Sequence, residues 1–237
     1  MELAFNINEL LDDIKDKVYP KKPPICPTCL SIDVDEVEII GAHDKALFWE
    51  CLNCSEFFLR YDKKETQKYL DKAGCKTKYM CEGNHDDWLN RFHEENPYLD
   101  FVAFPKAIKL KERGYKYYPA GEYLKIGKLH YYHGHHFSGV HHTRNHLMKL
   151  GANVMYGHYH DLQQTSVTHL DGVKSAWSIG CLKKMDAQSN SFLLNRRHNW
   201  SHAFAVVDYF DNGHFTVHIV QIIEGRTSLW GQLIRSK

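Results

Sequence analysis

Residues 153–160 read NVMYGHYH, a short apolar and aromatic run that ends in a glycine and two histidines. Such a run predicts a buried strand that enters a tight loop. Residues 143–150 have a helical composition and are followed by Gly151, a residue that commonly ends a helix. A helix followed by a strand whose loop carries polar side chains is typical of an α/β sheet, and ligands bind beyond the carboxyl ends of the strands in such sheets.

A second strand end of the same kind precedes this stretch. Residues 122–132 alternate like two strands joined by a turn at residues 127–128. The second of these strands runs into the sequence HGHH at residues 133–136. The pattern predicts another glycine-flanked histidine, His133, at the end of a strand.

The third strand end lies earlier in the chain. Residues 62–73 have a helical composition, and the β-prone residues 77–80 lead into the sequence GNHD at residues 83–86. Because the three predicted strands all end in polar loops, we expect the loops to converge on one pocket. After residue 161 the chain becomes strand-rich, with strands predicted at residues 203–207 and 214–223 around an Asp-Asn-Gly turn.

Histidine is unusually frequent in this part of the chain. The protein has 17 histidines, and nine of them fall between His130 and His160. Histidine is the commonest metal ligand and titrates near neutral pH, so the cluster indicates a metal or proton-transfer site. The clustered histidines outside the glycine-flanked positions are expected to be exposed, lining the rim at most, apart from one in the helix that is expected to pack in the core. The four expected at the surface are His135, His136, His141 and His142, and the one assigned to packing is His146.

The ordered motifs GNHD, HG and GHxH resemble the C-terminal motifs of the calcineurin-like metallophosphoesterases. The resemblance covers roughly residues 62–237 and implies an α/β fold of the α+β sandwich type, incomplete at its N-terminal side. It also implies a pair of divalent transition-metal ions (Mn, Fe, Zn or Ni) and hydrolysis of a phosphate ester by a metal-bridged hydroxide. The implied ligands of one ion are Asn84, His133 and His158.

The resemblance assigns two more residues. His160 is implied to reach the second ion, and His85 is implied to face the substrate as a general acid. The family's N-terminal motifs, aspartate-any-histidine and glycine-aspartate-any-any-aspartate, do not occur in this sequence. Asp62, which follows a strand-like run, is a weak substitute for the missing bridging carboxylate. Three interpretations therefore stay open, namely a complete phosphoesterase, a split enzyme that takes its missing ligands from a second chain, and a non-catalytic module that binds nucleic acid or protein.

Four cysteines form two Cys-x-x-Cys pairs that are 21 residues apart, which are Cys26 with Cys29 and Cys51 with Cys54. Four thiolates in this arrangement suit a tetrahedral structural zinc ion, and the segment resembles a zinc ribbon. Such a site leaves no coordination position open, so we assign it no catalytic role. Zinc ribbons commonly contact nucleic acid or protein, and by this analogy the candidate substrate is nucleic acid or a nucleotide.

The remaining features define the domains and the class of protein. We expect an amphipathic helix at residues 1–20, the zinc ribbon at residues 21–61 and the phosphoesterase-like domain at residues 62–237. With 43% hydrophobic and 25% charged residues the composition is globular, and the net charge of +1 does not favour nucleic-acid binding by the molecule as a whole. The sequence contains no apolar run long enough to cross a membrane, so we expect a cytoplasmic protein without membrane partners.

Overall fold

The computed structural model describes residues 34–40, 45–51, 57–59, 74–99, 103–183, 185, 193 and 198–235. The described residues fall into two compact units that divide between Pro119 and Ala120. The helices predicted at residues 1–20 and 62–73 lie outside the described residues, as do Cys26, Cys29, Cys54 and Asp62.

The first unit begins with a three-stranded antiparallel sheet in the order β1-β2-β3. Its strands are β1 (Val34–Ile40), β2 (Lys45–Cys51) and β3 (Phe57–Leu59). Cys51 is the last residue of β2 and pairs with Val34, the first residue of β1. The described cysteine of the second Cys-x-x-Cys pair is therefore at one end of this small sheet.

The rest of the first unit is a strand, two helices and a second strand. These elements are β4 (Lys78–Cys81), α3 (Asn84–Glu95), α4 (Phe104–Ala107) and β5 (Tyr115–Tyr118), and β4 pairs with β5 in parallel. Leu89 of α3 packs in the core with Phe104, Ile108 and Leu110. The backbone N–H of Phe104 donates to Asn90 Oδ1 at 2.9 Å, which ties α4 to α3.

The second unit is built on a five-stranded mixed sheet in the order β6-β7-β8-β10-β9. The strands are β6 (Leu124–Ile126), β7 (Leu129–Tyr131), β8 (Asn153–Tyr156), β9 (Leu162–His169) and β10 (Gly172–Ile179). The three central strands β7, β8 and β10 are parallel. Helix α5 (His142–Leu150) connects β7 to β8 and ends at Gly151, whose φ of 60° is the left-handed conformation that favours glycine.

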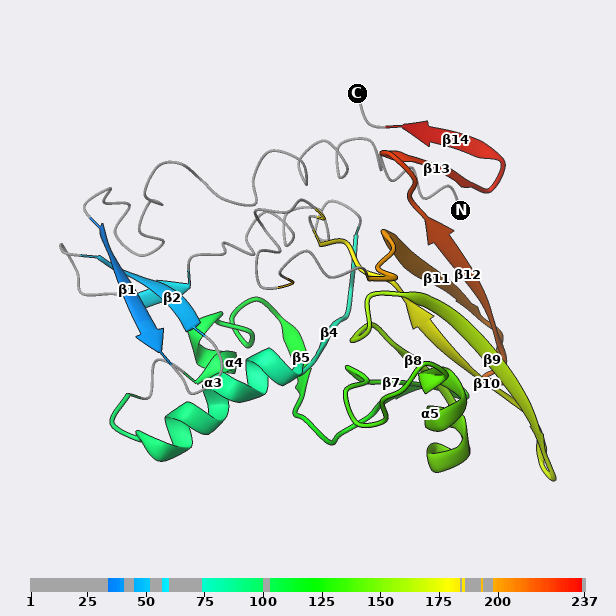
Figure 1. Ribbon diagram of the computed structural model, residues 1–237, viewed down its shortest axis with the longest axis horizontal. Coiled ribbons are helices and arrows are strands. Elements are labelled where there is room, and N and C mark those ends of the chain that lie inside the picture. The colour runs from blue at the N-terminus through cyan, green and yellow to red at the C-terminus, as the bar shows by residue number, and fades with distance from the viewer. Residues whose placement is uncertain are drawn as a thin grey trace. The chain divides into compact units, whose positions relative to one another are not determined.

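This sheet is covered on both faces. Because side chains alternate along a strand, Val154 and Tyr156 of β8 point to α5 and pack against Leu147, whereas Met155 points to the opposite face. There Met155 joins a core with Trp177 and the antiparallel hairpin of β11 (Ala203–Tyr209) and β12 (Phe215–Gln221). Figure 1 shows α5 and the β11–β12 hairpin on the two sides of the sheet. The second unit is therefore a helix–sheet–sheet sandwich.

A last hairpin follows, formed by β13 (Arg226–Leu229) and β14 (Gln232–Arg235). The strands predicted at residues 77–80, 122–132, 153–156, 203–207 and 214–223 and the helix predicted at residues 143–150 are confirmed to within a few residues. The fold of the described residues is thus mixed α/β, with more strands than helices and sheets of mixed orientation. None of the helices in the described part of the chain is long and apolar enough to cross a membrane.

Candidate metal centre

The loops after β7 and β8 lie side by side because these strands are parallel neighbours in the sheet. The carbonyl oxygen of His133 accepts hydrogen bonds from the backbone N–H of Gly157 at 3.3 Å and of His158 at 3.0 Å. Between these loops, Gly134 is buried and has a φ of 101°. The two glycine-flanked histidines that the sequence predicted at neighbouring strand ends therefore belong to one connected structure.

The imidazole rings of His133 and His158 also meet. Nδ1 of His158 lies 3.0 Å from Nε2 of His133. This separation suits either a hydrogen bond between the rings or two nitrogens bound to one cation. Ligands at about 2.0–2.1 Å from a metal and 3.0 Å apart subtend an angle of about 91–97° at the ion. The ring of His135 lies next to both, with centroid distances of 5.7 Å to His133 and 6.1 Å to His158.

His160 faces a different environment, although it is only two residues from His158. Its ring is against the indole of Trp200, with centroids 4.8 Å apart and the planes at 72°. Its backbone has a φ of 59°, the left-handed region in which residues other than glycine are uncommon. The carbonyl oxygen of His160 accepts from the backbone N–H of Ser201 at 2.8 Å, which joins the loop to the chain before β11.

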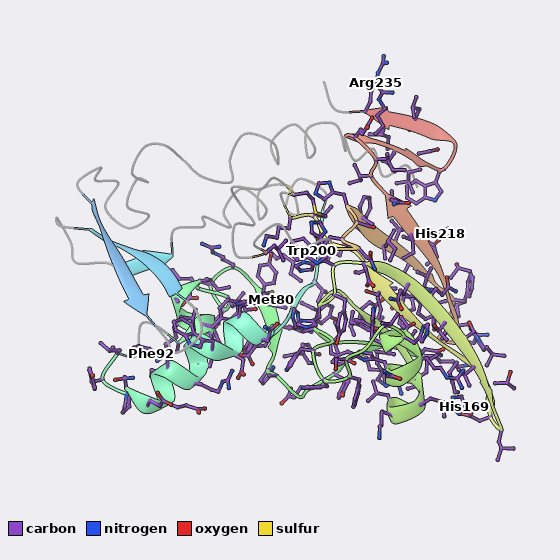
Figure 2. The ribbon with its side chains drawn as sticks, viewed as in Figure 1. Met80, Phe92, His169, Trp200, His218 and Arg235 are labelled. Carbon is purple, nitrogen blue, oxygen red and sulfur yellow. The ribbon has the colours of Figure 1, made fainter. Side chains whose placement is uncertain are left out.

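Trp200 extends the site beyond the histidines. Its ring contacts His198, and the ammonium of Lys183 lies 5.1 Å from the ring centroid. In Figure 2, Trp200 lies at the opposite end of the sheet from the tip of the β9–β10 hairpin, where His169 is labelled. Lys183 therefore places a positive charge beside Trp200, on whose ring His160 packs.

Asn84 and His85 belong to the first unit, and they do not lie in a loop as the sequence predicted. Both lie in the first turn of α3, which begins directly after Gly83. The Asp86 carboxylate accepts the backbone N–H of Gly83 at 3.0 Å, and Asp87 pairs with Arg91 at 3.1 Å, one turn along the helix. Carboxylates in the first turn stabilise a helix, so these residues explain why α3 begins at this point. Their role as metal ligand and general acid stays a prediction.

Within the described residues, no group of three or more His, Cys, Asp or Glu side chains is arranged so that it could hold a metal ion. What the described part of the chain does bring together is the pair of imidazoles of His133 and His158.

The structure tests the burial that the sequence predicted for the other clustered histidines. The expected exposure of His136 and His141 is confirmed, whereas His135 is half-buried. For His142 the expectation is wrong, because this side chain is only 2% exposed. The burial is possible because both ring nitrogens have polar partners, Tyr156 and Asp161. The expected packing of His146 is confirmed, since this residue is 0% exposed and its Nδ1 is hydrogen-bonded to the hydroxyl of Tyr132.

The environment of His146 makes the stability of the fold dependent on pH. Burial, followed by the nearby His142, lowers the pKa of His146 from 6.5 to about 4. Between these two values the unfolded chain takes up a proton that the folded chain does not. The contribution of His146 is therefore fully present above pH 6.5 and is lost as the pH falls towards 4.

We expect this single group to lower the free energy of unfolding by up to about 3 kcal/mol between pH 7.5 and pH 4. The His146→Phe variant keeps a ring in the cavity but cannot be protonated, so its stability should fall less steeply with pH. Urea unfolding at several pH values measures the difference, with the exposed His141→Ala variant as a control that keeps the wild-type slope. Parallel curves for wild type and His146→Phe would contradict the assignment.

Comparison of the chain with models of protein families, with characterised proteins and with solved structures gave no match.

Proposed function

We propose that this protein is a metal-dependent phosphoesterase that hydrolyses a phosphomonoester or phosphodiester. The observation that carries the proposal is the 3.0 Å approach of His158 Nδ1 to His133 Nε2 beyond the ends of two parallel strands. Imidazole pairs at the carboxyl end of an α/β sheet are the donors that Mn, Fe, Zn or Ni would accept. When bound, a pair of such ions supplies charge stabilisation at the phosphoryl group and an activated water.

The remaining binding and catalytic roles are assigned to residues of the chain. His133 and His158 would hold one ion, and His160 would contact the second ion. The assignment of Asn84 as a further metal ligand rests on the resemblance alone. His85 is exposed at the start of α3, so its imidazole can approach a substrate and donate a proton to the leaving oxygen. Trp200 lies beside His160, and Lys183 lies beside Trp200, so the two offer an aromatic surface and a positive charge to the substrate. A nucleotide or nucleic acid is the proposed substrate class.

A zinc ribbon at residues 21–61 is part of the same proposal. Its support is the three-stranded antiparallel sheet, in which Cys51 ends β2. A segment of this size rarely folds on a hydrophobic core alone, and a metal ion bound by Cys26, Cys29, Cys51 and Cys54 would supply much of its folding energy. We assign the ribbon a structural zinc and a role in contacting nucleic acid or protein.

The proposal predicts that the purified chain cleaves a chromogenic phosphodiester when manganese is added, and that His85→Ala lowers kcat for an alkyl ester by about 10²–10⁴-fold, the range of general acid catalysis. The loss should be smaller for a nitrophenyl ester than for an alkyl ester, because nitrophenolate leaves without protonation. His93→Ala, near the other end of α3, is the matched control and should retain activity.

Elemental analysis separates the proposed enzyme from the alternatives. Three bound metal ions per chain correspond to an ion pair and the ribbon zinc, whereas one ion corresponds to a non-catalytic module. Activity that appears only after mixing with a second chain carrying the absent aspartate motifs would identify a split enzyme. A purified chain that stays inert with every divalent ion and every added partner would contradict the proposed hydrolysis.

A further inference from the structure

His142 connects helix α5 to the loop that carries His158 and His160. It is the first residue of α5, and its buried imidazole has a partner at each nitrogen. Nε2 lies 3.0 Å from Asp161 Oδ2, and Nδ1 lies 2.7 Å from the hydroxyl of Tyr156. A neutral imidazole satisfies both contacts, with Nε2–H donating to the carboxylate and Nδ1 accepting from the phenol.

Asp161 ends the candidate metal loop and is itself fixed by several donors. Its Oδ1 accepts from the hydroxyl of Ser178 at 2.7 Å, and its Oδ2 accepts from the side-chain amide of Gln163 at 2.8 Å. Its backbone oxygen accepts from the N–H of Gly180 at 2.8 Å and from the same Ser178 hydroxyl at 3.0 Å. A buried carboxylate is stable only with such partners, so Asp161 is fixed to Ser178 of β10 and provides a rigid point to which His142 is attached.

The loop is also held from its middle residue. The ring of Tyr159 stacks on His142, with centroids 3.9 Å apart and planes at 18°, and its hydroxyl donates to the carbonyl of Phe137 at 3.2 Å. Tyr159 lies between the two histidines in sequence, and His160 has a left-handed backbone that needs support from its surroundings. His142 therefore contacts the residue before His160 and the residue after it.

We propose that His142 is a positioning residue of the candidate metal centre, which fixes the loop 157–161 through Tyr159 and Asp161 so that His158 and His160 are in place before a cation binds. The inference rests on the proposed function for its purpose, but the fixing of the loop is a property of the protein without metal. Preorganised ligands lose little conformational freedom on binding, so release of the loop weakens the metal site.

The experiment measures hydrogen exchange at the backbone amides of residues 157–161 without metal, together with Mn²⁺ affinity and global stability, in the full chain. In His142→Ala the loop amides should exchange at least about tenfold faster, and Mn²⁺ affinity should fall by about 10–100-fold. His142→Gln keeps one donor and one acceptor but loses the ring stack, so both effects should be smaller.

Thr143→Val is the matched control on the same helix. Its buried hydroxyl lies 2.6 Å from that of Thr165 and 3.4 Å from Oε1 of Gln163, so the variant loses a buried hydrogen bond but leaves the amide nitrogen of Gln163 on Asp161 and removes no hydrogen bond made directly to residues 157–161. It should lower global stability while loop exchange and Mn²⁺ affinity stay at wild-type values. If His142→Ala does not fold, the comparison of His142→Gln with Thr143→Val tests whether His142 fixes the loop 157–161.

The outcomes separate the two proposals. Loop exchange that is unchanged in the His142 variants overturns the positioning role, whatever the metal results are. A wild-type chain that binds no Mn²⁺, with loop exchange still accelerated by the His142 variants, contradicts the proposed function and leaves the fixing of the loop in place.

Discussion

Replacement of His158 by alanine is expected to lower Mn²⁺ affinity and metal-dependent phosphodiester cleavage by at least about a hundredfold. The reason is the position of its Nδ1, which lies 3.0 Å from His133 Nε2, a separation that would let both nitrogens bind one ion. The described part of the chain has no third His, Cys, Asp or Glu that could replace the lost nitrogen in this arrangement. Titration calorimetry with Mn²⁺ and the chromogenic assay measure the two losses.

The His133–His158 pair can be tested as a unit. His133→Ala should reproduce the loss seen for His158→Ala, and the double variant should be little worse than either single variant, because both nitrogens serve the same ion. His141→Ala removes an exposed histidine nearby in sequence and is the control for a general effect of histidine loss. Independent, additive losses would show that the rings do not share a cation, and an unchanged Mn²⁺ affinity would remove this pair from the proposed site.

The elements around this site were predictable because their signals are local. Residues 153–156 carry a β-strand pattern, and Gly151 marks the end of α5, so neither depends on distant parts of the chain. Nearby residues also predict the start of α3, because Gly83 followed by Asp86 and Asp87 is a pattern of helix initiation. The expectation of a loop there gave too much weight to the polar character of GNHD and too little to the position of its acidic residues.

The burial of His142 could not be predicted in the same way. Nothing in the residues around it distinguishes it from the exposed His141, which precedes it directly. Its burial depends on Asp161 and Tyr156, which reach it only when β8 is placed beside α5. The role of a polar residue in a core is set by partners that are distant in sequence, so the sequence predicted the strand ends and the histidine pair but not the network that supports them.

The Gly134→Ala substitution is expected to lower the free energy of unfolding by more than about 3 kcal/mol, the combined cost of a forced backbone and an overfilled core. Gly134 has a φ of 101°, and a Cβ atom there would lie 2.5–2.6 Å from three carbons of the Tyr156 side chain, Cβ, Cγ and Cδ2. Tyr156 is only 2% exposed and is held by its bond to His142 and by stacking on His146, so it has no room to move.

Comparison with Gly172→Ala separates the energetic cost of the clash with Tyr156 from the cost of backbone strain. Gly172 has a similar φ of 114°, but a Cβ atom there has no other atom within 4 Å. This variant should cost only the strain of about 1–3 kcal/mol, and urea unfolding of the two variants gives the difference directly. Because Gly134 follows His133, the surviving folded fraction of Gly134→Ala should also bind Mn²⁺ more weakly, whereas Gly172→Ala should not. Equal losses of stability in the two variants would mean that the Gly134 loop can move away from Tyr156, and the close packing of the two strand ends would then not be needed to hold His133 in place.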